Sequence, residues 1–424
     1  MRVLIVNTSE KTGGAAVAAN RLMEALINNG VKAKMLVRDK QTDSLTVVSA
    51  GNGWRQRWHF LWERWRIFMA MRFSRKHLFD VDIANVGTDI TSLPEFKEAD
   101  VIHLHWINQG FLSLSIIQKI LQSGKHVVWT MHDIWPATGI CHYTRGCYRY
   151  KSRCQQCPLL PGGGSKNDLS AKVWNRKTAL LQANHISFVA CSRWLEGEAK
   201  QSALLRGQHI MSIPNAIDTR VFHPMDKSEA RRKVGLPEQG HVILFVSQRV
   251  TDERKGIHYL VEAVNRLVEC YPSLRENTSV AILGGHAEDV ADELSLPVHA
   301  LGYVSDEQTI VAVYNAADVF VTPSLEDNLP NTIMESLACG VPCVGFAVGG
   351  IPEMIDHQKN GYVASPANSD DLADGIGWVL TVADAQSLSQ NALRKVSHNY
   401  SQSSVALRYV EIYHQVLAQK QFNI

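Results

Sequence analysis

The chain has 424 residues, which is too long for one ordinary domain and sufficient for two domains of about 200 residues each. Hydrophobic residues make up 45% of the sequence and charged residues 20%, so we expect full hydrophobic cores. The net charge of +2 argues against a general nucleic-acid binder, and the sequence has no uninterrupted apolar run long enough for a transmembrane helix.

The amino-terminal segment has the pattern of a nucleotide-type α/β domain. Residues 3–6 are a short apolar strand, a polar loop follows that ends in Gly13 and Gly14, and residues 15–29 are rich in helix formers. The glycine spacing is not G-x-G-x-x-G and gives little support to a dinucleotide cofactor. Taken alone, the glycine pair indicates a relaxed turn.

Residues 54–76 have the most unusual composition in the chain, because they combine many aromatic residues with seven basic ones. Large apolar residues recur every three or four positions, which places them on one stripe of a helix. A basic, tryptophan-rich helix can lie in a membrane interface that contains anionic lipid. A helix that packs on its own sheet explains the pattern equally well, with its arginines reaching water. The stripe contains Trp54, Trp58, Leu61, Trp65 and Phe68 and continues to Arg72.

Two further strands are predicted at residues 100–107 and 126–130. His103 and His105 alternate onto one face of the first strand, and His132 follows the second. Histidines at the carboxyl ends of such strands lie where α/β proteins form their sites. A single histidine is nevertheless as often a hydrogen-bonded core residue.

Four cysteines fall within seventeen residues, in a polar and turn-rich segment at 141–157. The amino terminus has no signal-peptide pattern, so we expect a cytoplasmic protein in which disulfides are disfavoured. The spacing therefore favours a structural zinc site over disulfides or four unligated thiols, with His142 as a spare ligand. The four expected thiolate ligands, which leave no open position for catalysis, are Cys141, Cys147, Cys154 and Cys157.

The domain boundary is expected shortly after the predicted strand at 186–192. The first domain then covers residues 1–205, and the second covers residues 206–400. We expect the strand at 210–215 to open the second domain. Residues 401–424 are predicted to form a last helix.

The second domain carries basic residues directly after a strong strand at 242–247. Arg249 follows this strand, and Lys255 precedes the next helix, where cations can bind a diphosphate. Arg254 is the alternative if the loop has a different register. Basic residues in a loop are more often only solvated, so their position alone does not establish a site.

The segment 317–353 reads as strand, loop, helix and strand, a βαβ unit whose loop lies at the edge of the sheet where ligands bind. Asp327, preceded by Glu326, lies on the loop. Glu335 lies in the helix, with seven residues between it and Asp327. Glu335 shares a helix face with Asn331 near the amino end. The N–H groups of that end suit a phosphate, and carboxylates suit sugar hydroxyls.

This segment, with the sequences LEDNLPNT and GGIPE, resembles the E-x7-E region of the retaining glycosyltransferases of family four. The resemblance implies the GT-B fold, in which two Rossmann-like α/β domains face each other across an interdomain cleft. It also implies that the last helix packs back on the amino-terminal domain. The sequence PNAID at 214–218 is similar to the family's PNG-aliphatic-D turn, and residues 302–304 to its base-lining segment.

The resemblance also implies roles for individual residues. The family's first acid contacts the donor sugar. Here Asp327 stands where the family has glutamate, so either Asp327 or Glu326 has this role. Glu335 would hold the nucleotide ribose, and the cations would bind the leaving diphosphate. The implied catalytic residues are His132, Asp327 and Glu335, and the implied donor-binding residues are Gly13, Gly14, Arg249, Lys255, Glu326, Asn331, Thr332 and Glu335.

The implied activity is transfer of a sugar from a nucleotide-diphosphate sugar to a glycan or lipid-linked acceptor, with retention of configuration. We expect a hexosyltransferase-type enzyme of surface polysaccharide biosynthesis, without a metal or other cofactor for catalysis. We expect it in the cytoplasm, with peripheral contact at the inner face of the membrane as one of the two interpretations of 54–76. The alternatives are a nucleotide-sugar epimerase or a phosphorylase on the same fold, and a non-catalytic nucleotide- or sugar-binding protein.

Overall fold

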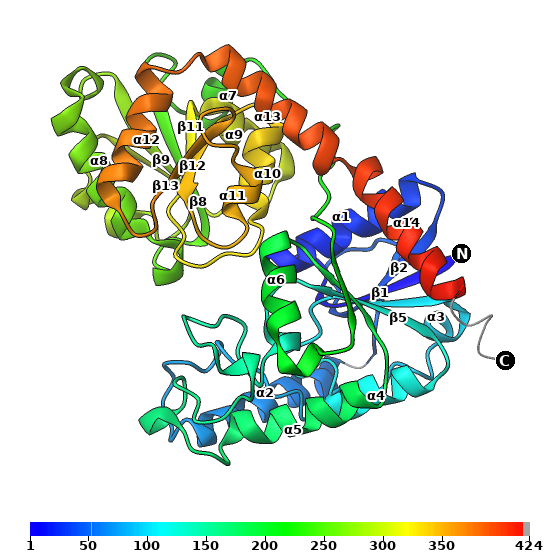
Figure 1. Ribbon diagram of the computed structural model, residues 1–424. Helices are drawn as coiled ribbons and strands as arrows, with labels where there is room; N and C mark the ends of the chain where they lie inside the picture. The colour runs from blue at the N-terminus through cyan, green and yellow to red at the C-terminus, as the bar shows by residue number, and fades with distance from the viewer. Residues whose placement is uncertain (52, 419–424) are drawn as a thin grey trace. The chain divides into compact units, whose positions relative to one another are not determined.

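The computed structural model describes residues 1–51 and 53–418. The chain divides into two compact units, and each is a parallel sheet covered by helices (Figure 1). The first unit contains Met1–Pro214 and the segment from Val405 on, and the second contains Asn215–Ser404. This architecture confirms the predicted α/β class with two Rossmann-like domains of the GT-B type.

The described part of the first unit contains a seven-stranded sheet in the order β3-β2-β1-β4-β5-β6-β7, in which all neighbours run parallel. Its central strands are buried over almost their whole length because helices cover both faces. The strands are β1 (Arg2–Ser9), β2 (Lys32–Asp39), β3 (Val47–Ser49), β4 (Val101–Leu104), β5 (His126–Met131), β6 (Ser187–Ala190) and β7 (His209–Ser212). The helices are α1 (Gly14–Asn28), α2 (Gly53–Ala70), α3 (Pro94–Glu98), α4 (Leu114–Gln122), α5 (Leu169–Gln182), α6 (Arg193–Gln201) and α14 (Gln402–Ala418).

The strand that we expected to open the second domain instead completes the first sheet. Strand β7 pairs in parallel with β6, with Ser187 opposite His209 and Ala190 opposite Ser212. The prediction was wrong because a short apolar strand carries no local signal for the sheet that it joins. Pairing with a neighbouring strand, here β6, determines which sheet the strand joins.

The described part of the second unit contains a six-stranded parallel sheet in the order β10-β9-β8-β11-β12-β13. The strands are β8 (His241–Arg249), β9 (Thr278–Gly285), β10 (Val298–Gly302), β11 (Val319–Thr322), β12 (Cys343–Phe346) and β13 (Gly361–Ala364). The helices are α7 (Lys227–Val234), α8 (Ile257–Cys270), α9 (Glu307–Ala316), α10 (Asn331–Ala338), α11 (Ile351–Met354), α12 (Ser369–Thr381) and α13 (Ala385–Asn399). The order changes direction between β8 and β11, which is where open α/β sheets bind ligands.

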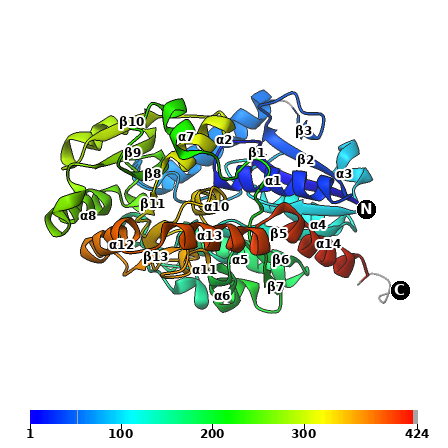
Figure 2. The same cartoon turned by 90° about the horizontal axis from the view of Figure 1, so that it is seen from above.

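Helix α14 directly follows α13 along the chain (Figure 2) and is anchored on the first unit. The Tyr413 hydroxyl lies 2.7 Å from Nδ1 of His103, and the Tyr409 hydroxyl lies 2.9 Å from Oγ1 of Thr130. All four side chains are buried, so these hydrogen bonds satisfy polar groups inside the core. The end of the predicted last helix, residues 419–424, lies outside the described residues.

Candidate functional site

Two cations share one buried carboxylate at the carboxyl edge of the second sheet. Asp327 lies in the loop after β11, next to the end of β8, and its side chain is buried. Lys255 Nζ donates to Asp327 Oδ2 at 2.6 Å, and Arg254 Nη1 lies 3.4 Å from the same oxygen. Arg254 Nη1 also donates to the backbone carbonyl of Glu326 at 2.9 Å. Both candidate cations of the loop between β8 and α8, Lys255 and its alternative Arg254, therefore contact the predicted acid, Asp327.

The loop of Asp327 approaches the loop of Arg254 and Lys255 closely, and this approach depends on glycines. A Cβ on Gly256 (φ +69°) would lie 2.0 Å from the carbonyl oxygen of Pro323, and one on Gly349 (φ +54°) would lie 1.7 Å from that of Asp327. A hydrogen bond from Leu325 N to Arg254 O, at 2.9 Å, joins the loops directly. The position of Asp327 is thus fixed by its backbone as well as by its charge.

The electrostatics of Asp327 favour the ionised form. Burial by itself would raise the pKa of this carboxyl, but the charges of Lys255 and Arg254 and the hydrogen bond from Lys255 outweigh it. The pKa therefore lies below its ordinary value. Asp327 is therefore a carboxylate that is paired with two cations. Such a carboxylate can exchange a cation for another ligand.

Helix α10 contributes Glu335 one turn after its start at Asn331. Glu335 is buried, and the Tyr314 hydroxyl donates to its Oε2 at 2.8 Å. Asn215 Nδ2 donates to Asn331 Oδ1 at 3.0 Å. Pro330 precedes the helix and provides no side-chain cap, so the N–H groups of the first turn, which includes Thr332, suit an anion.

Arg249 is the last residue of β8 and lies at the same edge of the sheet. Its side chain is exposed, and its Nε donates to Thr251 Oγ1 at 3.2 Å. The second unit therefore brings Lys255, Asp327 and the loop of Glu326 into contact. The exposed guanidinium of Arg249 stands at the strand end, without a share in the Asp327 ion pair.

In the first unit, His132 belongs to a row of imidazoles, in which its ring stacks on that of His105 and the rings of His105 and His103 are tilted. The Nε2 of His132 lies 2.9 Å from Nδ1 of His105, and its Nδ1 lies 3.5 Å from Sγ of Cys191. Burial lowers the pKa of His132 to about 4, although the charge of Asp133 opposes the shift. His132 is therefore a neutral imidazole, which can donate or accept a hydrogen bond but brings no positive charge. His103, by contrast, is a hydrogen-bonded core residue.

The glycine pair of the first unit lies at the start of α1. Gly13 has a φ of +91°, which side chains rarely adopt, yet a Cβ there would meet nothing within 4 Å. The conformation of the turn, and not crowding within the protein, explains the glycine. Gly14 is the first residue of the helix.

His142, which we considered a spare metal ligand, has both ring nitrogens engaged by carboxylates. Nε2 lies 2.6 Å from Asp82 Oδ2, and Nδ1 lies 2.7 Å from Asp133 Oδ2. Burial by itself would lower the pKa of His142, but the two acids raise it to about 10. The ring is therefore an imidazolium that joins two buried carboxylates, and the expectation of a spare ligand is wrong.

The cysteines of the segment 141–157 are free thiols and form no disulfide. Burial raises the pKa of Cys154 to about 12 and that of Cys157 to about 11, although Gly139 N–H donates to Cys154 Sγ at 3.3 Å. The nearby thiols Cys147 and Cys157 raise the pKa of Cys154 further, so the thiols are electrostatic neighbours. Within residues 1–51 and 53–418, no three His, Cys, Asp or Glu side chains form a ready metal site.

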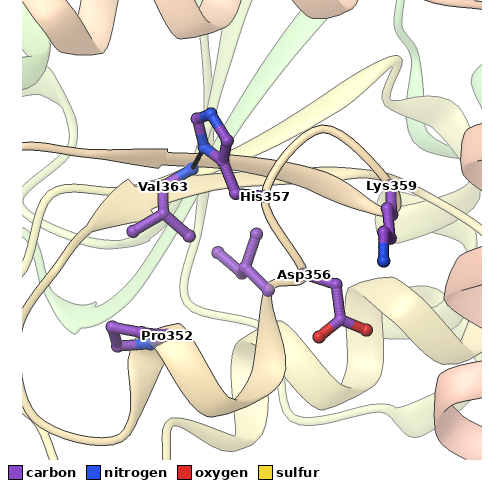
Figure 3. Close-up of a pocket in the computed structure, with 6 residues that line it drawn as sticks. Pro352, Asp356, His357, Lys359 and Val363 are labelled. Atoms are coloured by element: carbon purple, nitrogen blue, oxygen red, sulfur yellow. Dashed lines mark hydrogen bonds between the residues drawn. The ribbon is translucent and has the colours of Figure 1, made fainter.

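A cavity of about 360 Å³ lies beside α11 in the second unit (Figure 3). Within it, Val363 N–H donates to Nδ1 of His357 at 3.1 Å. None of the predicted site residues lines this cavity, so the candidate site is the sheet edge described above. The lining residues are Pro352, Ile355, Asp356, His357, Lys359 and Val363.

Sequence reasoning missed several residues that complete these clusters. Tyr314 and Asp82 lie outside every motif, and Gly349 belongs to the GGIPE sequence but had no role assigned to it. All three reach the site residues only through the folded chain. A better signal was available for Gly349, because a Gly-Gly turn after a strand indicates close backbone approach.

Comparison with known proteins shows that the chain is similar to glycosyltransferases. Residues 240–381 match the family described as Glycosyl transferases group 1. The chain is 27% identical over 417 residues to an uncharacterized glycosyltransferase of Methanocaldococcus jannaschii, which covers 95% of this chain and 94% of the relative. It is 31% identical over 183 residues to a D-inositol 3-phosphate glycosyltransferase of Thermobifida fusca, covering 41% of this chain and 42% of that relative.

Solved structures share the fold at low sequence identity. Sucrose-phosphate synthase from Thermosynechococcus elongatus has a TM-score of 0.67 and 20% identity, with 99% of each chain covered. Anabaena HepE in complex with UDP-glucose has a TM-score of 0.62 and 17% identity, with 98% of this chain and 100% of that chain covered. At these identities the likeness establishes the fold.

Proposed function

Because residues 240–381 match the glycosyl transferases group 1 family, we propose that the chain transfers a sugar from a nucleotide-diphosphate sugar to a glycan or lipid-linked acceptor. The observation that carries the proposal is the buried Asp327 carboxylate shared by Lys255 and Arg254 at the sheet edge. A nucleotide-sugar donor is supported by the structural neighbour HepE, which is described in complex with UDP-glucose. The proposed setting is surface polysaccharide biosynthesis in the cytoplasm.

The ion pair suggests how the donor is received. In the absence of donor, Lys255 is paired with Asp327, so its charge is already oriented at the sheet edge. A diphosphate would draw Lys255 and Arg254 toward its oxygens, because phosphate attracts cations at least as strongly as a carboxylate does. Asp327 would then be free to accept hydrogen bonds from sugar hydroxyls. Glu335, oriented by Tyr314, would accept hydrogen bonds from the ribose.

We further propose that transfer proceeds with retention and without a catalytic metal. The bond from the anomeric carbon to the phosphate oxygen breaks, and the acceptor oxygen forms a bond on the same face of the sugar. The departing phosphate oxygen takes the acceptor proton, so charge and atoms balance. Arg249, Lys255 and the amino end of α10 would stabilise the phosphate charge as it develops.

The roles of His132, Gly13 and Gly14 stay predictions. As a neutral imidazole, His132 suits a hydrogen bond to a sugar hydroxyl and does not suit stabilisation of the diphosphate by charge. The open space around Gly13 is compatible with a ligand close to the backbone.

The test is sugar transfer by Lys255→Ala and Glu335→Ala, assayed over a panel of nucleotide-diphosphate sugars with extracted lipid-linked and glycan acceptors. We expect each variant to lose about 100-fold in kcat/KM. Lys233→Ala is the matched control, because Lys233 is an exposed lysine on α7 of the same unit. Activity of both site variants within about threefold of wild type would show that the site is misassigned.

The same assay separates the alternatives. Donor isomerisation without an acceptor would indicate an epimerase, and phosphate-dependent release of a sugar phosphate would indicate a phosphorylase. Donor binding without any turnover would indicate a non-catalytic binding protein. Inversion in the product, read by NMR of the anomeric proton, would contradict the retaining mechanism.

We also propose that Cys141, Cys147, Cys154 and Cys157 bind structural zinc. Their spacing, their free state and their mutual electrostatic proximity support this, and the loop would have to close around the ion. Metal analysis of the purified protein should give about one equivalent of zinc. Cys154→Ser and Cys157→Ser should each lose it, whereas Cys270→Ser, at an exposed cysteine of α8, should keep it. Less than about half an equivalent in the wild type contradicts the proposal.

A further inference from the structure

Helix α2 turns polar residues toward the protein and tryptophans toward solvent. Its fully buried residues are Gln56, Glu63, Arg64 and Ile67, three of which are polar. On the opposite side, Trp58, Trp62 and Trp65 are 66%, 42% and 49% exposed. A surface helix ordinarily has the reverse arrangement. The interpretation that this helix packs its aromatic stripe on its own sheet is therefore wrong.

The inward polar residues hold α2 in this orientation. Glu63 Oε1 accepts the backbone N–H groups of Ile83 and Ala84 at 3.0 and 2.6 Å. Arg64 Nη1 donates to the carbonyl of Leu78 at 2.7 Å, and its Nη2 forms a buried ion pair with Asp82. Rotating the helix to bury the tryptophans would leave these buried charges without partners, which costs several kcal/mol.

Close backbone contact also fixes the helix. A Cβ on Gly110 would lie 2.7 Å from the backbone carbon of His59, so the loop after β4 touches the helix backbone directly. On the exposed side, the rings of Trp62 and Trp65 stack with centroids 5.2 Å apart. The exposed aromatic face thus belongs to a helix whose orientation is fixed by its contacts with the first unit.

The charge around this face is strongly one-sided. Residues 53–76 contain seven basic residues and one acidic residue, although the whole chain has a net charge of only +2. The acidic residue is Glu63, which is buried, so the exposed charges of the segment are all positive. The exposed basic residues are Arg55, Arg57, Arg66, Arg72, Arg75 and Lys76.

We propose that the outer face of α2, formed by Trp58, Leu61, Trp62, Trp65 and Met69 with the surrounding arginines, docks in plane on a bilayer that contains anionic lipid. All five of these apolar residues are exposed, and a continuous apolar surface on a soluble protein marks an interaction site. Tryptophan suits the membrane interface, and the all-positive rim is complementary to anionic headgroups.

The helix lies on the membrane and does not enter it. No helix in the described part of the chain is long and apolar enough to cross a bilayer. This inference does not depend on the proposed sugar transfer, because it concerns a surface that contains none of the predicted site residues.

The test is co-flotation of the full-length protein with vesicles of phosphatidylcholine alone or with about 30% phosphatidylglycerol. We expect flotation with the anionic vesicles and a fall of at least about fivefold when salt is raised from low to high ionic strength. The combined variant Trp58→Ser, Trp62→Ser, Trp65→Ser and the variant Arg57→Gln, Arg66→Gln should each reduce binding at least about fivefold.

The controls change residues of the same kinds elsewhere in the first unit. Leu45→Ser removes an apolar side chain that is 92% exposed, and Lys34→Gln with Lys172→Gln removes two exposed charges. Both control variants should bind within about twofold of wild type. Circular dichroism and the thermal midpoint of each variant establish that it is folded.

Three outcomes would overturn the proposal. The first is a wild type that does not bind anionic vesicles, and the second is equal binding to both kinds of vesicle without salt dependence. The third is loss of a concentration-dependent dimer in the tryptophan variant, measured by light scattering, when the wild type does not bind vesicles. That last result would assign the face to a second copy of the chain.

Discussion

At the scale of single residues, Asp327 orients the two cations of the neighbouring loop between β8 and α8. Lys255 and Arg254 converge on one carboxylate that is itself fixed by backbone contacts, so little reorganisation is needed before an anion binds. Preorganised charge is the form of electrostatic stabilisation that contributes most to catalysis. The pair also stabilises the fold, and this contribution depends on pH.

Asp327→Asn should lower the free energy of unfolding of the second unit by about 2 kcal/mol at neutral pH, because a charged hydrogen bond is lost. The folded-state pKa of Asp327 lies below the ordinary value of 3.8. Its contribution is therefore present above that value and is lost as pH falls through the folded pKa. Urea unfolding at neutral pH and in the acid range measures this.

In the acid experiment, the difference between the Asp327→Asn variant and wild type should shrink toward zero once the wild-type carboxyl is protonated. Asp292→Asn, at an exposed aspartate of the same unit, is the control and should show no such trend. A difference that stayed constant with pH would mean that the ion pair contributes nothing specific.

Gly349 offers a second test at this scale. Gly349→Ala would place a Cβ 1.7 Å from the Asp327 carbonyl oxygen at a positive φ, so the loop must move. We expect a loss of at least about 3 kcal/mol in stability, or a displaced loop with transfer reduced about 100-fold. Thermal unfolding and the transfer assay measure the two effects.

Gly235→Ala is the matched control for Gly349→Ala. Gly235 also has a positive φ, +71°, but a Cβ there meets nothing within 4 Å. It should cost only about 1 kcal/mol and leave transfer unchanged. Equal effects of the two substitutions would show that backbone strain alone, and not contact with the Asp327 loop, explains Gly349.

The residue-scale site was predictable only in part from the sequence. The residue types and the spacing of Asp327 and Glu335 predicted the loop and the helix on which the structure has these two acids. Which of the adjacent acids is held by the cations was not predictable. That choice depends on the path of the loop, which Gly349 fixes from 22 positions away. Partners such as Tyr314 came from a neighbouring helix that has no motif.

At the scale of elements, buried charges connect helix α2 with the loops that follow the strands of the first sheet. Arg64 of α2 pairs with Asp82, His142 joins Asp82 to Asp133, and Asp133 is the neighbour of His132. A chain of buried ion pairs thus runs from Arg64, on the inward side of α2, to Asp133, which is adjacent in sequence to the predicted catalytic residue His132. Each link is buried, so removing one leaves uncompensated charge.

His142→Gln should destabilise the first unit by about 3 kcal/mol at neutral pH, because it removes the positive charge between two buried acids. The pKa of His142 is raised from an ordinary 6.5 to about 10. A raised pKa gives a contribution that is fully present below 6.5 and is lost as pH rises through about 10. Wild-type stability should therefore fall across this window.

Urea unfolding at several pH values between 6.5 and 10 measures this dependence, which the His142→Gln variant should largely lack. His209→Gln, at an exposed histidine of β7 in the same unit, provides the control. If the free energy of unfolding of wild type and of the His142→Gln variant changed in parallel with pH, the inference that a charged His142 joins Asp82 to Asp133 would be wrong.

The elements show where local pattern is sufficient and where it is not. Apolar strands and their turn residues predicted β1, β5, β8 and β11 within a few positions, because buried parallel strands have one composition. The pattern of α2 gave its period correctly but could not say which face is buried. That face is chosen by Glu63 and Arg64, whose partners Ile83 and Asp82 lie beyond the helix.

At the scale of the whole molecule, the two units carry separate cores and distinct sets of predicted residues. The ion pair of Lys255 and the carboxylate of Glu335 lie in the second unit, and the imidazole row and the face of α2 lie in the first. Units with independent cores can unfold in separate transitions. Ligands then identify the unit to which they bind, because a ligand stabilises only the state that holds it.

UDP should therefore raise the unfolding midpoint of the second unit selectively. A nucleoside diphosphate at about 100 times its dissociation constant stabilises its binding unit by about 2.7 kcal/mol. The tryptophans report mainly on the first unit, which contains those of α2, whereas Trp378 of α12 lies in the second. Unfolding monitored by fluorescence of a variant that retains only Trp378 isolates the second unit.

In that variant, Lys255→Ala should abolish most of the shift caused by UDP, since it removes the cation nearest to the proposed diphosphate, while Lys233→Ala should preserve it. If UDP shifted the unfolding of the wild type, whose other tryptophans lie in the first unit, but not that of this variant, the proposed donor site in the second unit would be wrong even if sugar transfer were observed. This measurement is independent of turnover, and so it separates failure of the donor site from the absence of a suitable acceptor.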